Sequence, residues 1–595
     1  MYLKKSRSKG SNRTFLEIAK KYRDPITKKP RDRIVKSIGY LDDLEKEFED
    51  PIAHFKMLAA KMTEEEKESK QSTLSFSIDE ELELDTDNRR NYGYVAIMKI
   101  YHDLLLHDFL AAKARYQRFG FNTNSIMLLL VISRILYPGS KNKAFADKGR
   151  YFERFDFELE DIYRALTHFA KIGPDLQKHL HDQITSEYGR DTSIIYYDTT
   201  NFYFEIDQDD DLRKRGVSKE HRPNPIVQMG LAMDRDGVPI DYKIFPGNKL
   251  DSETFKSIIG EICRNYETGR VIVVGDKGII TGDNIWYLIG GKPSEPRHGY
   301  VFSFSVRGGT DEFKKYVLDE TGYTDANGNP PDKNSDYKIK TRIIARKIDV
   351  TRQKDGKKMK KIVYEKQVVY WSKDYAMRAK AEREPLIKRA QVFIDEPSRY
   401  KRHIHHGSAK YITGVDKETG EVEPESVLMF NDDVLTEDEK YDGYYCIVTS
   451  ELEMDSGQII DTYRGLWEIE ESFRITKGDL EGRPVYVSKE DHIDAHFLTC
   501  FISLIIVRLL QKITGYNYSV SELVDTLKRI SCSNEHENIY LFDYRSAVTD
   551  EIGKAVGIEF KKKRKCLGDI KTSNIAWQCK KVIREISDCQ SMIRR

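Results

Sequence analysis

The chain has 595 residues, which is too long for one small core and predicts two to four packed units. Hydrophobic residues make up 39% and charged residues 33% of the chain, a composition that excludes an intrinsically disordered protein. The formal net charge is only +1, but residues 1–40 contain 13 Lys or Arg against 3 Asp or Glu, a net of +10. A second basic run spans Lys561–Lys565. Although each run alone could be a solvated surface, basic runs at both ends favour a nucleic-acid partner.

The cysteines and apolar stretches bear on the compartment. Seven cysteines are scattered without a CxxC pair, so we expect neither a disulfide framework nor a zinc site, and the cytoplasm fits. The basic N-terminus is unlike a signal peptide. The most apolar stretches, 125–136 and 497–511, are interrupted by Arg and fall short of the ~20 apolar residues that span a bilayer. We therefore predict buried core helices and no membrane partner.

The first third of the chain changes character twice. Residues 1–50 contain short pieces with β propensity, and 51–90 read as a helix followed by an acidic linker. Apolar residues then recur at helical spacing through 91–185.

A strand-rich region follows. Residues 193–205 are β-branched and aromatic, and 225–247 read as two strands joined around Asp236-Gly237, a strong hairpin signal. An amphipathic helix (252–266) and an apolar strand (270–278) come next. This order of strand, hairpin, helix and strand predicts a mixed α/β sheet.

The remaining chain contains an interruption and a helical end. Residues 299–443 carry alternating strand-like pieces and a helix near 375–395. A buried strand resumes at 444–450, and a long helix is predicted from about Ser456 to Lys477. The apolar helix and a basic helical C-terminal region complete the chain.

Three acidic residues stand out by position. Asp198 and Asp276 each end an apolar strand, and strand ends are where the sites of open α/β sheets gather. Taken alone, each Asp is more simply explained as a turn cap after a strand. The third is Glu470, in the helix "YRGLWEIEESFRITK". Steps of three and four residues put seven side chains on one predicted helix face: Tyr463, Leu466, Trp467, Glu470, Phe473, Arg474 and Lys477.

Together the three acids suggest a site for a hard metal ion. Mg²⁺ prefers oxygen ligands and binds through a few carboxylates together with substrate phosphates. A pair of such ions suits phosphodiester cleavage and strand transfer. Arg474 and Lys477, on the same predicted face, could hold backbone phosphates. The alternative to a metal site is a surface ion pair between Glu470 and Arg474, without a catalytic role.

The motifs "YDTTNFYFE", "VVGDKGI" and "YRGLWEIEESFRITK" resemble those of DDE transposases of bacterial insertion sequences, in the insertion-sequence-4-like group. That group carries a helix signature Y-x2-R-x3-E-x6-K. The resemblance covers roughly residues 90–515. It implies that Asp198, Asp276 and Glu470 bind Mg²⁺ (or Mn²⁺), and that Tyr463, Trp467 and Lys477 contact DNA. The signature Arg falls on Leu466, and Arg474 could supply the missing charge.

The resemblance implies an α/β fold with an RNase H-like catalytic core, interrupted by a β-rich insertion, between a helical N-terminal DNA-binding region and a helical C-terminal tail. The predicted divisions are a basic arm and acidic linker (1–90), a helical DNA-binding region (91–190), the first part of the core (191–298), the insertion (299–443), the second part of the core (444–515) and the basic helical tail (516–595).

The implied activity is cleavage at transposon ends and transfer of the 3′-hydroxyl strand to target DNA, by a homodimer on double-stranded DNA. Two alternatives remain: a metal-dependent nuclease without strand transfer, and a non-catalytic DNA-binding protein derived from a transposase. Among weaker signals, His403 and His405 favour a polar or DNA-facing patch over a metal site, and His492 and His496 favour packing or capping roles.

Overall fold

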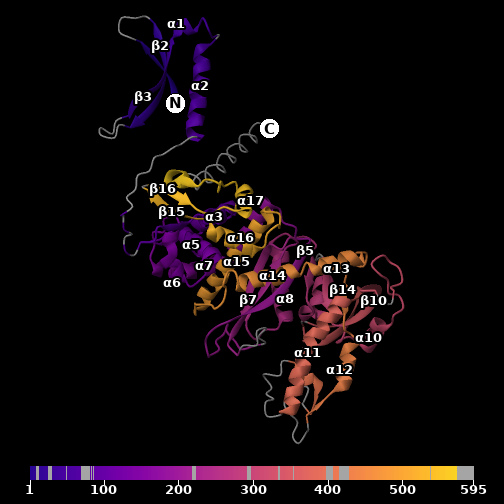
Figure 1. The fold of residues 1–595 in the computed structure, drawn as a ribbon. Helices are drawn as coiled ribbons and strands as arrows, with labels where there is room; N and C mark the ends of the chain where they lie inside the picture. Colours follow the sequence, from indigo (N-terminus) through magenta and orange to yellow (C-terminus); the bar gives the residue numbers. More distant parts are fainter. Residues whose placement is uncertain are drawn as a thin grey trace. The chain divides into compact units, whose positions relative to one another are not determined.

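The chain forms two compact units, Met1–Asp87 and Asn88–Arg595, in a computed structural model (Figure 1). The structure describes residues 1–7, 13–23, 30–48, 50–68, 79, 81, 84, 86–216, 223–290, 297–332, 335–352, 354–396, 407–414, 428–536 and 538–571.

The N-terminal unit is a small antiparallel sheet with a helix packed on it. Its strands β1 (Tyr2–Arg7), β2 (Thr14–Arg23) and β3 (Pro30–Tyr40) pair in chain order. A short helix α1 (Leu41–Leu44) leads to α2 (Pro51–Glu68), which packs along β1. The predicted β-leaning pieces and the helix after them are therefore confirmed.

The larger unit begins with a helical region, as predicted. Its helices are α3 (Tyr94–Asp103), α4 (Leu106–Ala114), α5 (Thr123–Leu136), α6 (Lys141–Ala146) and α7 (Leu159–Tyr188), with a 3-10 turn η1 (Asp147–Arg150). The apolar helix α15 (Glu490–Ile513) packs against α5 and α7, although some 300 residues or more separate them in the chain (Figure 1). By length and composition α15 could cross a membrane, but 94% of its most apolar window is buried inside the structure. We therefore describe it as a core helix.

An eight-stranded sheet forms the middle of this unit, in the order β10-β11-β14-β9-β8-β5-β6-β7. Its strands are β5 (Ile194–Tyr203), β6 (Ile226–Met233), β7 (Pro239–Pro246), β8 (Ile272–Gly275), β9 (Gly299–Phe304), β10 (Tyr337–Thr351), β11 (Lys358–Ser372) and β14 (Tyr444–Thr449). Strands β5, β8 and β9 run parallel, and the other neighbours are antiparallel. The predicted hairpin is confirmed, since Gly237 turns the chain between β6 and β7 with φ of 75°.

Helices cover the two faces of this sheet. Helices α8 (Asp251–Asn265) and α9 (Gly282–Ile289) bury their apolar residues with Ile195 and Tyr197 of β5, and a 3-10 turn η2 (Lys277–Ile279) lies beside α8. Helices α13 (Ser456–Arg464), α14 (Trp467–Lys477) and α15 share the other core, with Tyr196 and Phe202 of β5. Alternation along β5 therefore directs Asp198 and Thr200 to the α14 side.

The segment predicted as an insertion continues the sheet. Its first strand, β9, lies between β8 and β14, and β10 and β11 extend the sheet beyond β14. Its remaining elements are α10 (Asp311–Leu318), α11 (Lys373–Asp395), η4 (Ser408–Tyr411), β12 (Ile412–Thr413), β13 (Met429–Phe430) and α12 (Asp432–Glu439). The bounds 299–443 of a separate insertion remain a prediction.

The C-terminal region corrects the prediction of a helical tail. Besides α16 (Val520–Arg529) and α17 (Ala547–Val556), it contains β15 (Ser531–His536), β16 (Ile539–Phe542) and β17 (Arg564–Cys566). These strands join β4 (Arg89–Asn91) in a sheet ordered β17-β16-β15-β4. Local sequence patterns do not predict these strands, because β15 pairs with β4, more than 400 residues earlier in the chain. Residues 572–595 lie outside the described part.

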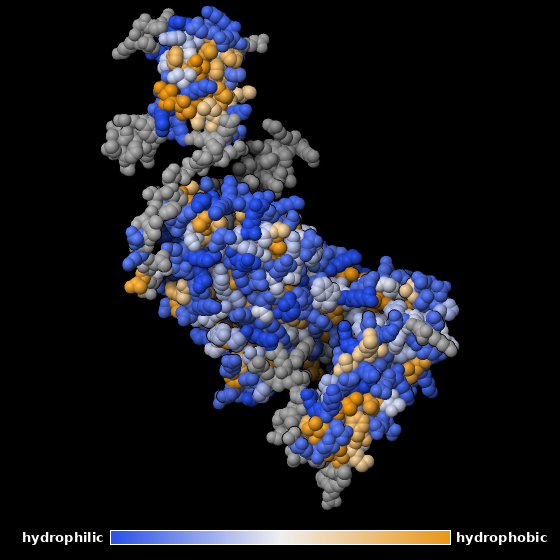
Figure 2. All heavy atoms as spheres, viewed as in Figure 1, coloured by the Kyte–Doolittle hydropathy of each residue, from blue (hydrophilic) through white to orange (hydrophobic). Residues whose placement is uncertain are grey.

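The exposed surface of the larger unit is mainly hydrophilic on the side shown in Figure 2. This matches a core formed by the buried apolar residues of the sheet and its covering helices.

Candidate active site on β5 and at the end of β8

Two predicted carboxylates are brought together by strand register. In the parallel pair β5–β8, Tyr197 lies opposite Gly275, so Asp198 and Asp276 occupy the next positions on neighbouring strands. Neighbouring strands lie about 4.8 Å apart. Both carboxylates are half-buried. The prediction that a strand ends at the acid is confirmed for Asp276, because β8 stops at Gly275. It is wrong for Asp198, which lies in the middle of β5, since this strand continues to Tyr203.

Asp276 is held in place by its neighbours. Its Oδ1 accepts hydrogen bonds from the Ser303 hydroxyl (2.7 Å) and from the backbone N–H of Lys277 (2.6 Å). Tyr463 lies close by: its hydroxyl is 2.9 Å from that of Tyr445. Burial, then the neighbouring Tyr445, raise the pKa of Tyr463, and the charge of Asp276 adds to this shift. Tyr463 is thus placed beside the second carboxylate.

The helix predicted from Ser456 to Lys477 is two helices, which corrects the single-face argument. Helix α13 ends at Arg464 and α14 begins at Trp467. Between them the N–H of Leu466 bonds to the carbonyl of Tyr463, three residues earlier, so the turn is tighter than in an α-helix. Leu466 and Phe473 are buried, whereas Trp467 is 56% exposed, so the seven predicted side chains do not share one environment.

Two contacts fix α14 along the Asp198 side of β5. At its start, a Cβ on Gly465 would lie 2.5 Å from Cζ of Tyr196, so the backbone there lies directly on the tyrosine ring. At its end, Nζ of Lys477 is 5.5 Å from the ring centroid of Phe202. Since Tyr196 precedes Asp198 and Phe202 follows it on the same face, α14 runs in the same direction as β5.

Glu470 and Asp198 lie at similar levels along α14 and β5 when ideal rises are applied to these contacts. The six residue steps from Tyr196 to Phe202 span about 20 Å of strand, and the twelve steps from Gly465 to Lys477 would span about 18 Å at the rise of an α-helix. Glu470 is about 7.5 Å along this helix and Asp198 about 6.6 Å along this strand. Glu470 is exposed. This matched spacing is the principal observation on the site.

The donor set suits a hard cation without enclosing one. In the described part of the chain, no three His, Cys, Asp or Glu side chains already form a group that could hold a metal ion. The two half-buried carboxylates and the exposed helix carboxylate nonetheless offer only oxygen atoms. That chemistry fits Mg²⁺, which keeps several waters and needs few protein ligands.

The predicted DNA-contacting residues have different surroundings. Arg474 donates to both carboxylate oxygens of Glu471, at 2.8 and 2.7 Å, and lies 3.3 Å from Asp479. The expected surface pair is therefore Glu471–Arg474 and not Glu470–Arg474. Leu466, at the signature Arg position, is only 6% exposed and packs into the core.

A buried arginine missed by the sequence reasoning holds α14 on α15. Arg508 is 1% exposed and lies 3.0 Å from Oε2 of Glu468. Its Nη2 donates to the Ser472 hydroxyl (2.8 Å) and to the Glu468 carbonyl (2.7 Å). The visible signal was a single Arg inside the apolar stretch 497–511, because a charge there needs a partner.

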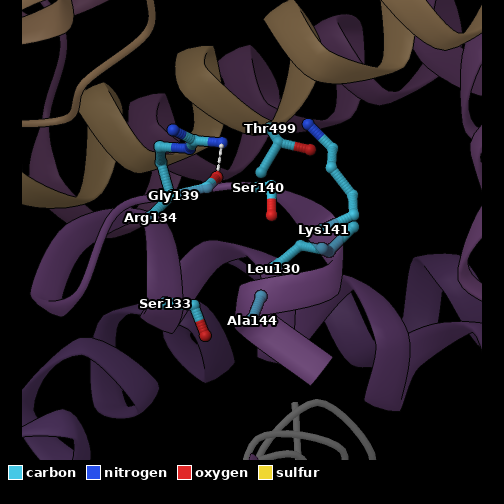
Figure 3. A pocket seen from close by; sticks show the side chains of 8 residues that line it. All are labelled: Leu130, Ser133, Arg134, Gly139, Ser140, Lys141, Ala144 and Thr499. Carbon is cyan, nitrogen blue, oxygen red and sulfur yellow. Dashed lines mark hydrogen bonds between the residues drawn. The ribbon is translucent and has the colours of Figure 1, made fainter. Parts of the chain in front are cut away.

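A small cavity lies beside the loop that follows α14, lined by Arg134 and Lys141 (Figure 3). Arg134 donates to the carbonyls of Leu480 (3.2 Å) and Glu481 (3.0 Å). Lys141 Nζ is 2.8 Å from Nδ1 of His496, whose Nε2 is 3.0 Å from the Gly482 carbonyl. Buried cations thus hold the loop next to the helix that carries Glu470.

The histidine interpretations have separate outcomes. His496 lies between Lys141 and the Gly482 carbonyl, a packing and bonding role as favoured. His492 is 3.4 Å from the Thr167 hydroxyl and stacks on Tyr163. His403 and His405 lie outside the described residues.

These features define a mixed α/β protein with acidic residues at neighbouring positions of two parallel strands of its sheet. Residues 3–73 match the family described as IS1634 family transposase, N-terminal domain. No curated protein matches the chain. The family match supports an insertion-sequence transposase, a class of enzyme that binds and cleaves DNA.

Proposed function

We propose that the chain is a DDE-type transposase whose catalytic carboxylates are Asp198, Asp276 and Glu470. The observation that supports this proposal is the register of β5 and β8, which makes Asp198 and Asp276 neighbours, together with the contacts of Gly465 and Lys477 with β5, which run α14 along the same strand. The matching family domain at the N-terminus supports the same class independently.

The strand order supports an RNase H-like core. The segment β7-β6-β5-β8-β9 has three antiparallel strands followed by two that run parallel to β5. Helices α8 and α9 connect β7 to β8 and β8 to β9. This arrangement is the one expected of an RNase H-like core, with β14, β11 and β10 as additions at one edge. In this proposal β9 belongs to the core and not to the insertion predicted over 299–443, and β14 lies outside the core.

The three carboxylates would hold Mg²⁺ (or Mn²⁺). When bound, the ions supply activation of the attacking oxygen and charge stabilisation of the leaving oxygen. Ser303 fixes one oxygen of Asp276, which reduces the motion of this ligand. Tyr463, Trp467, Arg474 and Lys477 would contact DNA beside the acids; Arg474 would have to exchange Glu471 for a phosphate.

The reaction we propose is cleavage at transposon ends followed by attack of the freed 3′-hydroxyl on target DNA. The assembly would be a homodimer on paired ends, acting in the cytoplasm. A strand-transfer assay with pre-cleaved 3′-hydroxyl ends distinguishes this activity from that of a nuclease that cuts without joining. Retention of full strand transfer by Arg474→Ala would refute the idea that Arg474 replaces the signature Arg.

The catalytic assignment is tested with the full chain and a duplex carrying the element's own ends. Asp198→Asn, Asp276→Asn and Glu470→Gln should each abolish cleavage, while DNA affinity and Tm stay near wild type. Asp191→Asn is the matched control, because Asp191 precedes the opposite end of β5. Mn²⁺ binding measured by calorimetry should weaken in the three variants and not in the control. Cleavage by Glu470→Gln at the wild-type rate would disprove the assignment.

A further inference from the structure

The cations of the N-terminal sheet are divided between its two faces. By strand register, Leu16 and Ile18 share one face of β2, and both are fully buried. Phe55 and Ala59 of α2 are buried too. Helix α2 packs on the sheet along β1.

The same face is basic where it extends toward β3. Lys20 lies directly opposite Arg33, and Lys36 lies opposite Ile18. All three cations are exposed. Like charges directly opposite one another on a sheet destabilise it. A polyanion bound across β2 and β3 would relieve this repulsion.

The opposite face has a different character. The two acidic residues of the described strands, Glu17 and Asp32, both lie on it by register. Lys4 lies 3.2 Å from Asp32, and Lys21 lies over the ring of Tyr2 at 5.7 Å. Cations on this face are therefore engaged within the unit.

We propose that Lys20, Arg33 and Lys36 bind backbone phosphates of duplex DNA. The phosphates of DNA and these three side chains are complementary in charge. No acidic residue of the described β-strands lies on the face that carries Lys20, Arg33 and Lys36. Residues 3–73, which match the transposase N-terminal domain, include all three. The inference rests on the proposed function for its ligand, and assigns the surface that contacts it.

The test uses the full chain and a fluorescent duplex of random sequence, with affinity measured by anisotropy over a NaCl series. Each phosphate contact contributes about 0.9 to the slope of log affinity against log salt concentration. The triple variant Lys20→Ala, Arg33→Ala, Lys36→Ala should therefore lower the slope by about 2.7. The variant Lys4→Ala, Lys21→Ala on the other face should leave it unchanged.

Folding is checked by thermal unfolding and by two further variants. Lys20→Arg with Lys36→Arg keeps the charge and should keep the slope. Should the triple variant unfold, the three single alanine variants should each lower the slope by about 0.9. An unchanged slope in the folded variants, an equal loss in the opposite-face control, or a loss confined to single-stranded DNA would each overturn the proposal. Asp198→Asn retains the slope in either case, so failure here is distinct from failure of the catalytic assignment.

Discussion

The close contact between Gly465 and Tyr196 gives a sensitive test of how α14 is positioned. In Gly465→Ala the new Cβ would meet Cζ of Tyr196 at 2.5 Å, whereas ordinary contacts begin at 3.4 Å. Helix and ring must therefore separate by about 0.9 Å or more. Overpacking of this kind costs about 1–3 kcal/mol of unfolding free energy. Since α14 carries Glu470, the displacement also moves a proposed catalytic carboxylate.

The displacement should also lower activity. A misplacement of about 1 Å at a reacting centre can lower the rate about 100-fold. We expect Gly465→Ala to reduce single-turnover cleavage of end-bearing DNA by about this factor while DNA affinity is retained. Gly120→Ala is the matched control, because a Cβ on Gly120 meets nothing within 4 Å. Its unfolding free energy should change by no more than about 0.5 kcal/mol.

A second substitution checks the cause. Tyr196→Phe removes the hydroxyl oxygen, which is the atom nearest to the new Cβ. It should partly restore both stability and cleavage in Gly465→Ala. Residues in contact typically couple by about 0.5–3 kcal/mol in such a double-mutant cycle. If Gly465→Ala cleaves and unfolds like Gly120→Ala, the placement of Glu470 through this contact is wrong.

Three further predictions concern the supports of the site. Burial, and next the nearby Arg134, lower the pKa of Lys141 to about 7. Between pH 7 and about 10 the unfolded chain therefore binds a proton at this residue that the folded chain does not, and the free energy of unfolding should rise with pH by up to ~1.4 kcal/mol per pH unit. Urea unfolding of Lys141→Met should lack this pH-dependent contribution. Arg508→Met leaves Glu468 without its buried partner and should lower the free energy of unfolding in urea by about 3–5 kcal/mol, and adding Glu468→Gln should recover part of this loss. A loss below about 1 kcal/mol would show that Arg508 does not hold α14 on α15. Leu466→Arg restores the signature residue but introduces a charge at a 6% exposed position, so Tm should fall and the rate of DNA cleavage should not increase. A more active variant with an unchanged Tm would contradict this expectation and show that the new side chain reaches DNA.

Local sequence patterns determined the individual elements of the fold. The β-branched run around Asp198, the Asp236-Gly237 hairpin and the apolar strand before Asp276 were predictable because alternation and turn chemistry are properties of adjacent residues. The same patterns located the buried helices α5 and α15. They also predicted that Asp198 and Asp276 each end a strand, which is correct for Asp276 and wrong for Asp198, because β5 continues to Tyr203.

Only the tertiary structure decided how these elements meet. The position of β9 between β8 and β14, and the pairing of β15 with β4, depend on partners distant in the chain. Helical spacing predicted one continuous face, but the tight turn at Leu466 divides it into two helices. The approach of Ser303 and Tyr463 to Asp276 likewise arises from packing between separate elements. Register and side-chain packing are set by contacts across the core, which no local pattern encodes.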